Sequence, residues 1–132
     1  MKFDHIGIFV KTLSSGREQI RKLFDIQSIS KEFNDKLMSV SVQFLYDKSG
    51  ICYEIVAPYG ENSPVDNVLS SKKNILNHVA YKVQDFDEAI EKYIELRCIP
   101  LGKASNALAF DNARVIFFLT PLGIILELIE DK

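Results

Sequence analysis

The fold of this chain is decided by two short stretches, Phe3-Asp4-His5-Ile6-Gly7-Ile8-Phe9-Val10 and Leu76-Asn77-His78-Val79-Ala80-Tyr81-Lys82-Val83. Each stretch places a histidine near the start of a strand-like run of apolar residues. The two histidines are the only ones in the chain, and they are 73 positions apart. The stretches therefore indicate a duplicated unit, in which each copy begins with a strand that carries one histidine.

A pair of glutamates repeats at the same offset. Glu54 lies within Ile51-Cys52-Tyr53-Glu54-Ile55-Val56-Ala57, and Glu127 lies 73 positions later within Gly123-Ile124-Ile125-Leu126-Glu127-Leu128-Ile129. Each half thus contains one histidine and, 49 residues further on, one glutamate. A carboxylate in the middle of so apolar a strand is costly unless it is paired or bound to a metal.

Taken singly, each of these residues has a simpler interpretation. A strand histidine is more often a satisfied or half-exposed side chain than a ligand, and a strand glutamate can face solvent at a sheet edge. Four such residues at matched offsets are hard to explain as independent accidents, and imidazole and carboxylate groups are the ligands that a divalent ion binds. The sequence therefore predicts that four residues converge on one metal ion: His5, Glu54, His78 and Glu127.

Length and composition restrict the class of protein. The chain has 132 residues, 47% of them hydrophobic, which is enough for one domain with a sizeable core. The net charge is −2 with acidic and basic residues interspersed, which argues against nucleic acid and against a membrane surface as partners. No apolar run reaches transmembrane length and the N-terminus lacks a signal-peptide layout, so we expect a cytoplasmic protein.

Helical and strand patterns give both halves the same order of elements. Ser15 and Glu18 fit a capping box at the start of one helix, and Asp85 fits the cap of a second helix with the clearest helical periodicity in the chain. Strands follow each helix. They are expected near 28–33, 39–46 and 51–57 in the first half, and near 98–104, 113–119 and 123–130 in the second.

Each half is therefore β-α-β-β-β. We expect a single domain over 1–132, with a first module of about 1–58, a linker of about 59–74 that contains a short helix near 65–69, and a second module of about 75–132. Neither half alone can cover both faces of its small sheet. The expected fold is α+β, in which two tandem βαβββ modules with pseudo-twofold symmetry form a cupped mixed sheet around the metal site.

This order of elements, and the residues on them, resemble the vicinal oxygen chelate superfamily of glyoxalases, bleomycin resistance proteins and dioxygenases. The likeness is greatest to methylmalonyl-CoA epimerase and glyoxalase I-like proteins, and it rests on residues 4–7, 54–58, 77–85 and 123–128. It covers essentially the whole chain. The resemblance implies one divalent ion (Zn, Ni, Co, Mn or Fe) on the four predicted ligands, with two positions left for water or substrate oxygens.

The resemblance also implies a function. It is that of a metal-dependent isomerase or lyase, which moves a proton next to the chelated carbonyl of a small 2-oxo or acyl-thioester substrate. Glu127 and Glu54 are the candidate catalytic bases, because glyoxalase I relatives use a metal-bound carboxylate in this role. Where the epimerases carry an acidic base, this chain has Leu37, with Glu32 and Asp35 nearby as substitutes.

Polar residues on the third strand of each half predict a substrate pocket. Ser41 and Gln43 share one face of that strand, and Arg114 lies at the place equivalent to Ser41, where it could hold a carboxylate or a phosphate. An exposed sheet edge is the alternative for these residues.

Two other functions and the oligomeric state stay open. One is a non-catalytic small-molecule binding or resistance protein, and the other is an Fe(II)-dependent ring-cleaving dioxygenase. Both modules lie in one chain, so a complete site needs no second subunit, yet the resemblance is to a fold family in which homodimers are common.

Overall fold

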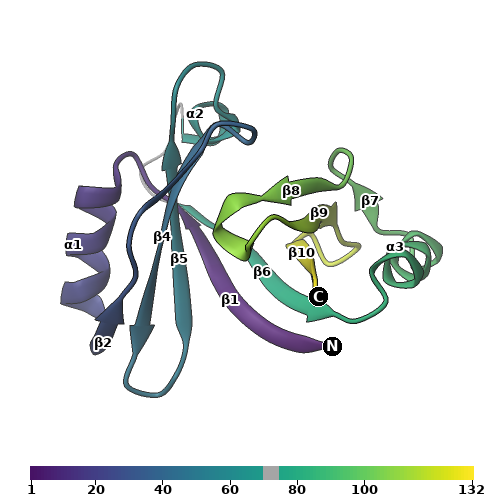
Figure 1. Cartoon of the computed structure of the whole chain (residues 1–132), viewed down its shortest axis with the longest axis horizontal. Helices are drawn as coiled ribbons and strands as arrows, with labels where there is room; N and C mark the ends of the chain where they lie inside the picture. The colour runs from purple at the N-terminus through teal and green to yellow at the C-terminus, as the bar shows by residue number, and fades with distance from the viewer. Residues whose placement is uncertain (70–74) are drawn as a thin grey trace. The chain divides into compact units, whose positions relative to one another are not determined.

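The computed structural model describes residues 1–69 and 75–132 (Figure 1). Within them, ten strands of a mixed sheet and three helices give the α+β class that the sequence predicts. The residues group into two compact units. The N-terminal unit is His5–Asn77, and the C-terminal unit is His78–Lys132 together with Met1–Asp4.

The strands of the N-terminal unit follow the order β2-β4-β5-β1, and β3 also pairs with β4. β1 and β5 run parallel, whereas β4 and β5 form an antiparallel hairpin. The bounds are β1 Lys2–Phe9, α1 Leu13–Leu23, β2 Ile26–Ile29, β3 Phe33–Asp35, β4 Val40–Asp47, β5 Cys52–Pro58 and α2 Pro64–Leu69.

The C-terminal unit repeats this arrangement. Its strands follow the order β7-β9-β10-β6, and β8 also pairs with β9. β6 and β10 run parallel, and β9 and β10 form the antiparallel hairpin. The bounds are β6 Ile75–Val83, α3 Phe86–Glu95, β7 Ile99–Pro100, β8 Ser105–Ala107, a 3-10 turn Leu108–Phe110, β9 Ala113–Leu119 and β10 Ile125–Glu130.

One strand predicted in each half is instead two short strands. The segment near 28–33 forms β2 and β3, because the Ser30 hydroxyl, rather than a backbone carbonyl, accepts the N–H of Phe44 and interrupts the ladder. The segment near 98–104 forms β7 and β8. Pro100 has no N–H to extend the ladder, and Gly102 adopts a positive φ of 123°.

The two long helices begin at equivalent positions. Asp85 caps α3, as predicted, by accepting the N–H of Glu88 at 3.1 Å. The capping box predicted at Ser15 is wrong, because α1 begins earlier in the chain, and it is Thr12 Oγ1 that accepts the N–H of Ser15 at 3.1 Å. Thr12 and Asp85 are again 73 positions apart.

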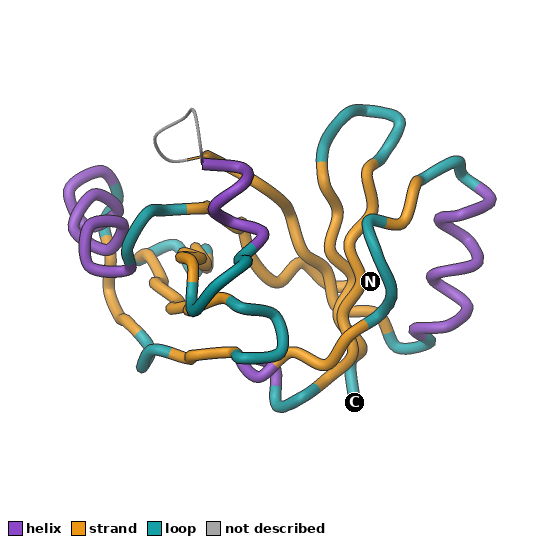
Figure 2. The backbone as a smooth tube through the Cα atoms, turned by 90° about the horizontal axis from the view of Figure 1, so that it is seen from above, coloured by secondary structure: helices purple, strands orange, loops and turns teal. Residues whose placement is uncertain are grey.

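Each unit has its own core between one face of its strands and its long helix, and Figure 2 shows α1 and α3 each lying along the strands of their own unit. Strand side chains alternate between faces, so the residues of opposite parity point away from the helix and carry the candidate site. The N-terminal core contains Val10, Leu13, Ile20, Leu45, Ile55 and Ala57, and the C-terminal core contains Val83, Phe86, Cys98, Ile116, Phe118, Leu126 and Leu128.

The linker helix is present as α2, which buries Val65 and Leu69. Residues 70–74 of the predicted linker lie outside the described residues, and the module boundaries stay a prediction. Across the described part of the chain, no helix combines the length and apolarity needed to cross a membrane.

Candidate metal centre

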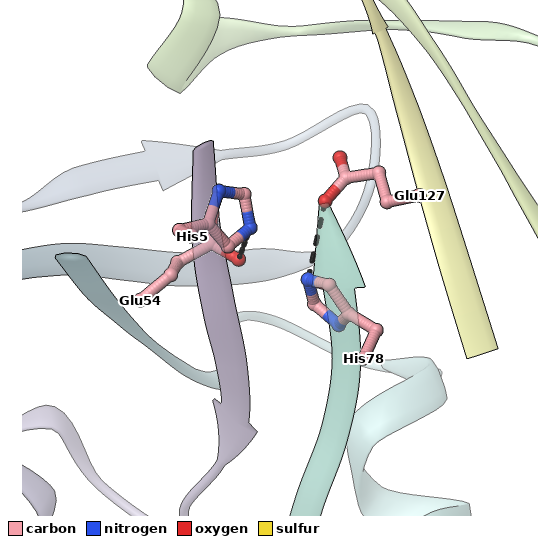
Figure 3. A group of neighbouring side chains, drawn as sticks. All are labelled: His5, Glu54, His78 and Glu127. Atoms are coloured by element: carbon pink, nitrogen blue, oxygen red, sulfur yellow. Dashed lines mark ion pairs between the residues drawn. The ribbon is translucent and has the colours of Figure 1, made fainter. Parts of the chain in front are cut away.

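The first candidate pair joins His5 on β1 to Glu54 on β5. Because these strands are parallel neighbours, Glu54 lies opposite Gly7, two residues after the histidine and on the same face. Nε2 of His5 lies 3.2 Å from Oε1 of Glu54 (Figure 3). Both side chains are buried, so this contact is formed away from bulk water.

The second pair repeats the first. Glu127 on β10 lies opposite Ala80 on β6, two residues after His78, and these strands are again parallel. Nε2 of His78 lies 3.1 Å from Oε1 of Glu127, and both side chains are buried (Figure 3). The 73-residue offset of the sequence is therefore also a repeat of strand register and of the atoms that meet.

A phenylalanine stands against each histidine, which the sequence analysis missed. Phe44 on β4 lies opposite Glu54, and its ring meets that of His5 edge-on with the centroids 6.0 Å apart. Phe117 on β9 occupies the equivalent place in the C-terminal unit, 5.2 Å from the histidine ring. The sequence does contain a signal for this pair, because the two phenylalanines are also 73 positions apart. Packing of this kind restricts rotation of the imidazole.

The donor set fits a divalent ion. Each unit supplies one imidazole nitrogen and one carboxylate oxygen, and all four side chains are buried. These donor types suit Zn, Ni, Co, Mn or Fe(II), and a buried carboxylate requires a partner that balances its charge. The atoms that would bind the ion, Nε2 and Oε1, are the ones that approach each other in each pair.

The predicted pocket residues Ser41 and Gln43 lie on the helix side of β4. They pair across the hairpin with Ala57 and Ile55, which belong to the core beneath α1. Gln43 Oε1 accepts a hydrogen bond from Arg17 of α1 at 2.7 Å. Side chains that line a pocket beside Glu54 would have to lie on the opposite face of β4. Ser41 and Gln43 lie instead on the face toward the helix.

Arg114 also lies on the helix side, in the C-terminal unit. Its guanidinium donates to both carboxylate oxygens of Glu130, at 3.2 and 2.8 Å, and to Oδ1 of Asp87 at 3.2 Å. It also lies over the ring of Phe86, 4.7 Å from the centroid. The hydrogen bonds from Arg114 hold the pKa of Glu130 below its ordinary value. This arginine ties α3 to β9 and β10, a role different from the predicted contact with substrate.

The turn between β3 and β4 contains the position where the resemblance expects a base. Leu37 occupies it and is 72% exposed. Of the two nearby acids, Glu32 lies 3.3 Å from Arg17, and the buried Asp35 accepts the backbone N–H of Met38 at 3.1 Å. Both acids therefore have contacts that account for their positions without a role in proton transfer.

Comparisons with known proteins agree with this architecture. The sequence model of the Glyoxalase/Bleomycin resistance protein/Dioxygenase superfamily matches residues 4–117. The uncharacterised protein YqjC of Bacillus subtilis (strain 168) is 24% identical over 134 residues, which cover 99% of this chain and 93% of that protein.

Solved structures with the same fold include two bacterial proteins. The hypothetical protein BH1468 of Bacillus halodurans C-125 superposes with a TM-score of 0.83 at 21% identity, over 99% of this chain and 94% of that one. Methylmalonyl-CoA epimerase from Mycobacterium tuberculosis superposes with a TM-score of 0.81 at 20% identity, over 99% of this chain and 88% of that one. At these identities the likeness concerns the fold.

Proposed function

Because the chain belongs to the glyoxalase/bleomycin resistance protein/dioxygenase superfamily, we propose that it is a metal-dependent enzyme that moves a proton on a small carbonyl substrate. The observation that carries this proposal is the repeated pair. In each unit a buried histidine Nε2 faces a buried glutamate Oε1 with the same strand register. The proposed ligands are His5, Glu54, His78 and Glu127.

We propose further that both pairs bind one ion, and the course of β1 supports this. Its first three residues, 2–4, belong to the C-terminal unit, where Asp4 lies 3.8 Å from Lys82 on the strand of His78. The next residue is His5, which belongs to the N-terminal unit. Consecutive Cα atoms are about 3.8 Å apart, so the covalent chain itself limits how far this ligand can lie from the C-terminal unit.

The chemistry follows from the ligand types. A divalent ion held by these side chains would polarise a chelated carbonyl and make the neighbouring C–H more acidic. The proton then needs an acceptor, and Glu54 and Glu127 are the buried carboxylates that the proposal places there. The phenylalanine beside each histidine helps to exclude water from these groups.

Small 2-oxo compounds and acyl thioesters are the proposed substrates. Several structural relatives are named methylmalonyl-CoA epimerases, and that name describes isomerisation of an acyl thioester. The exposed Leu37 cannot transfer a proton. We therefore assign proton transfer to a glutamate of the pairs rather than to the β3–β4 turn, in an isomerase or lyase reaction.

Leu37 also favours a second candidate function. A protein that binds a small molecule on this fold without chemistry needs no base, and leucine at this turn is compatible with that role. The two functions differ in a measurable way, because only the enzyme exchanges the proton next to the carbonyl.

Elemental analysis by mass spectrometry, followed by NMR in D2O, tests the proposal. We expect about one divalent ion per chain in the wild type and none in His78→Ala, because a ligand is lost. We also expect exchange of the α-proton on at least one member of a panel of 2-oxo acids and acyl thioesters. No uptake of Co, Ni, Mn or Zn would refute the metal site, whereas metal without exchange would favour the binding protein.

A further inference from the structure

Apolar side chains lie beside Glu127 on the face that carries it. Phe117 lies directly opposite Glu127, and Leu119 lies opposite Ile125, two residues before the glutamate. β7 extends the second row, because Ile99 pairs with Leu119. The same face of three neighbouring strands is therefore apolar next to a proposed metal ligand.

Several of these side chains are open to solvent. Ile99 is 59% exposed, Leu101 is 50% exposed and Leu119 is 37% exposed, while Phe117 and Ile125 are partly buried. Leu101 lies beside Phe117, to whose carbonyl it donates its backbone N–H at 2.8 Å. None of these residues belongs to the core beneath α3. A contiguous exposed apolar surface of this kind is typical of a binding site.

The N-terminal unit has no equivalent surface at the matching positions. Cys52 stands where the C-terminal unit has Ile125, and Tyr46 stands where it has Leu119. Across from Tyr46 lies Ser28, which brings a second hydroxyl to the row. The apolar row is therefore a property of the C-terminal unit and not a general consequence of the repeated fold.

We propose that Ile99, Leu101, Phe117, Leu119 and Ile125, called here the acyl patch, bind the hydrocarbon chain of an acyl or alkyl substrate whose reacting carbonyl lies at Glu127. This inference rests on the proposed function and adds the substrate class. Two residues along a strand span about 6.6 Å and neighbouring strands lie about 4.8 Å apart, so the patch begins within reach of a short alkyl chain. Because the patch is continuous with Glu127, we take the substrate to be its occupant. Binding of a second copy of the chain is the alternative that the test distinguishes.

Alkyl hydroxamic acids test the acyl patch, because they chelate divalent ions and are available with chains of increasing length. The readout is binding to the Co(II)-loaded protein by isothermal titration calorimetry. From acetohydroxamate to hexanohydroxamate we expect the affinity to rise about fourfold for each added methylene group. Leu119→Asn and Ile99→Asn should flatten this rise and leave acetohydroxamate binding unchanged. Leu23→Asn, the same substitution at an exposed leucine of α1, should retain it.

Circular dichroism first establishes that each variant is folded, and three results then overturn the inference in distinguishable ways. Equal affinity for all chain lengths in the wild type, with acetohydroxamate bound, removes the acyl patch and leaves the proposed function standing. Absence of bound metal by elemental analysis removes the proposed function and the patch with it. Loss of a dimer by light scattering in Leu119→Asn, with the chain-length dependence unchanged, assigns the surface to an interface between copies of the chain.

Discussion

The two units place their histidine–glutamate pairs alike and differ in what surrounds them. In the N-terminal unit, Cys52 and Phe44 beside Glu54 are both buried. In the C-terminal unit, Phe117 beside Glu127 is only partly buried, and the row next to it opens to solvent. On the proposed function, we expect from this difference a division of roles, in which Glu54 serves as a fixed ligand and Glu127 faces the substrate.

The helix sides of the units show a similar divergence. In the N-terminal unit Arg17 of α1 donates a hydrogen bond to Gln43 of the sheet. In the C-terminal unit the arginine is on the sheet instead, and Arg114 donates to Asp87 of α3. The same architecture is thus joined by polar contacts at positions that are not equivalent. What the halves retain in common is the register of the histidine–glutamate pairs, which is what the proposed function requires.

Removing either histidine should have the largest effect. His5→Ala and His78→Ala each delete one ligand from an equivalent position, so we expect metal affinity to fall by more than about 100-fold in both, beyond the loss seen when outer-shell partners are removed. Both histidines lie on the face away from the cores, so the fold should remain. Elemental analysis and circular dichroism measure the two effects. Full occupancy in either variant would show that the units do not contribute equally.

Substitution of the two glutamates should have different effects, whereas substitution of the two histidines should have similar effects. In Glu127→Gln the amide can still bind metal but cannot accept a proton, so we expect kcat to fall about 10²–10⁴-fold with the metal content retained. Glu54→Gln also keeps an oxygen that can bind metal, so we expect its metal content to be retained as well and its kcat to fall much less. Side-by-side rates and metal contents decide the assignment. Unchanged activity in Glu127→Gln would remove this glutamate as the base, and the opposite ranking would exchange the roles.

The ligand pairs could be predicted because strand parity and a repeated offset depend on sequence alone. The residues of a substrate pocket could not be predicted in this way, because their positions also depend on the register of the hairpin. Phe44 rather than Gln43 lies opposite Glu54, and a slip of one residue in the turn exchanges the two faces. The turn sequence predicts a hairpin between β4 and β5 without specifying that register, so the side of the sheet on which Ser41 lies does not follow from it.

Tertiary contacts explain the remaining differences between the predicted and the observed helices and strands. The capping box at Ser15 is a local pattern, but Gly16 packs against Val10 and the helix begins early enough to place it there. The split of β2 from β3 likewise depends on the hydroxyl of Ser30, which accepts a backbone N–H of β4. Contacts with neighbouring segments of the chain decide these points, and propensity does not encode them.

The two cores offer a comparison at equivalent buried positions. Leu45 and Phe118 are 73 positions apart and neither is exposed to solvent. We expect Leu45→Ala to lower the free energy of unfolding by about 2–5 kcal/mol and Phe118→Ala by about 3–5 kcal/mol, because each leaves a cavity beneath its helix. Urea unfolding measures both. A loss below about 1 kcal/mol at either position would contradict the core described for that unit.

The helix caps should have a smaller and more equal effect. Thr12→Ala and Asp85→Ala each remove the side-chain oxygen that accepts an N–H in the first turn, so we expect each to cost about 1 kcal/mol. Ser14→Ala is the matched control, because this exposed residue lies within the first turn of α1 and is not the cap. Thermal unfolding compares the three. A loss in Ser14→Ala as large as in Thr12→Ala would show that the cap does not decide where α1 begins.

The smallest effect should come from acid acting on the Arg114–Glu130 contact of the C-terminal unit. Hydrogen bonds from Arg114 hold the pKa of Glu130 below its ordinary value of 4.5. A depressed carboxylate pKa stabilises the folded state above the unfolded value, and this contribution is lost as the pH falls below 4.5 and through the folded pKa. Arg114→Met should therefore lie below the wild type in Tm at pH 6.5 and converge with it in acid, whereas the exposed Arg21→Met should run parallel to the wild type. A gap for Arg114→Met that stays constant down to pH 3 would mean that packing over Phe86, and not the ion pair, accounts for the loss.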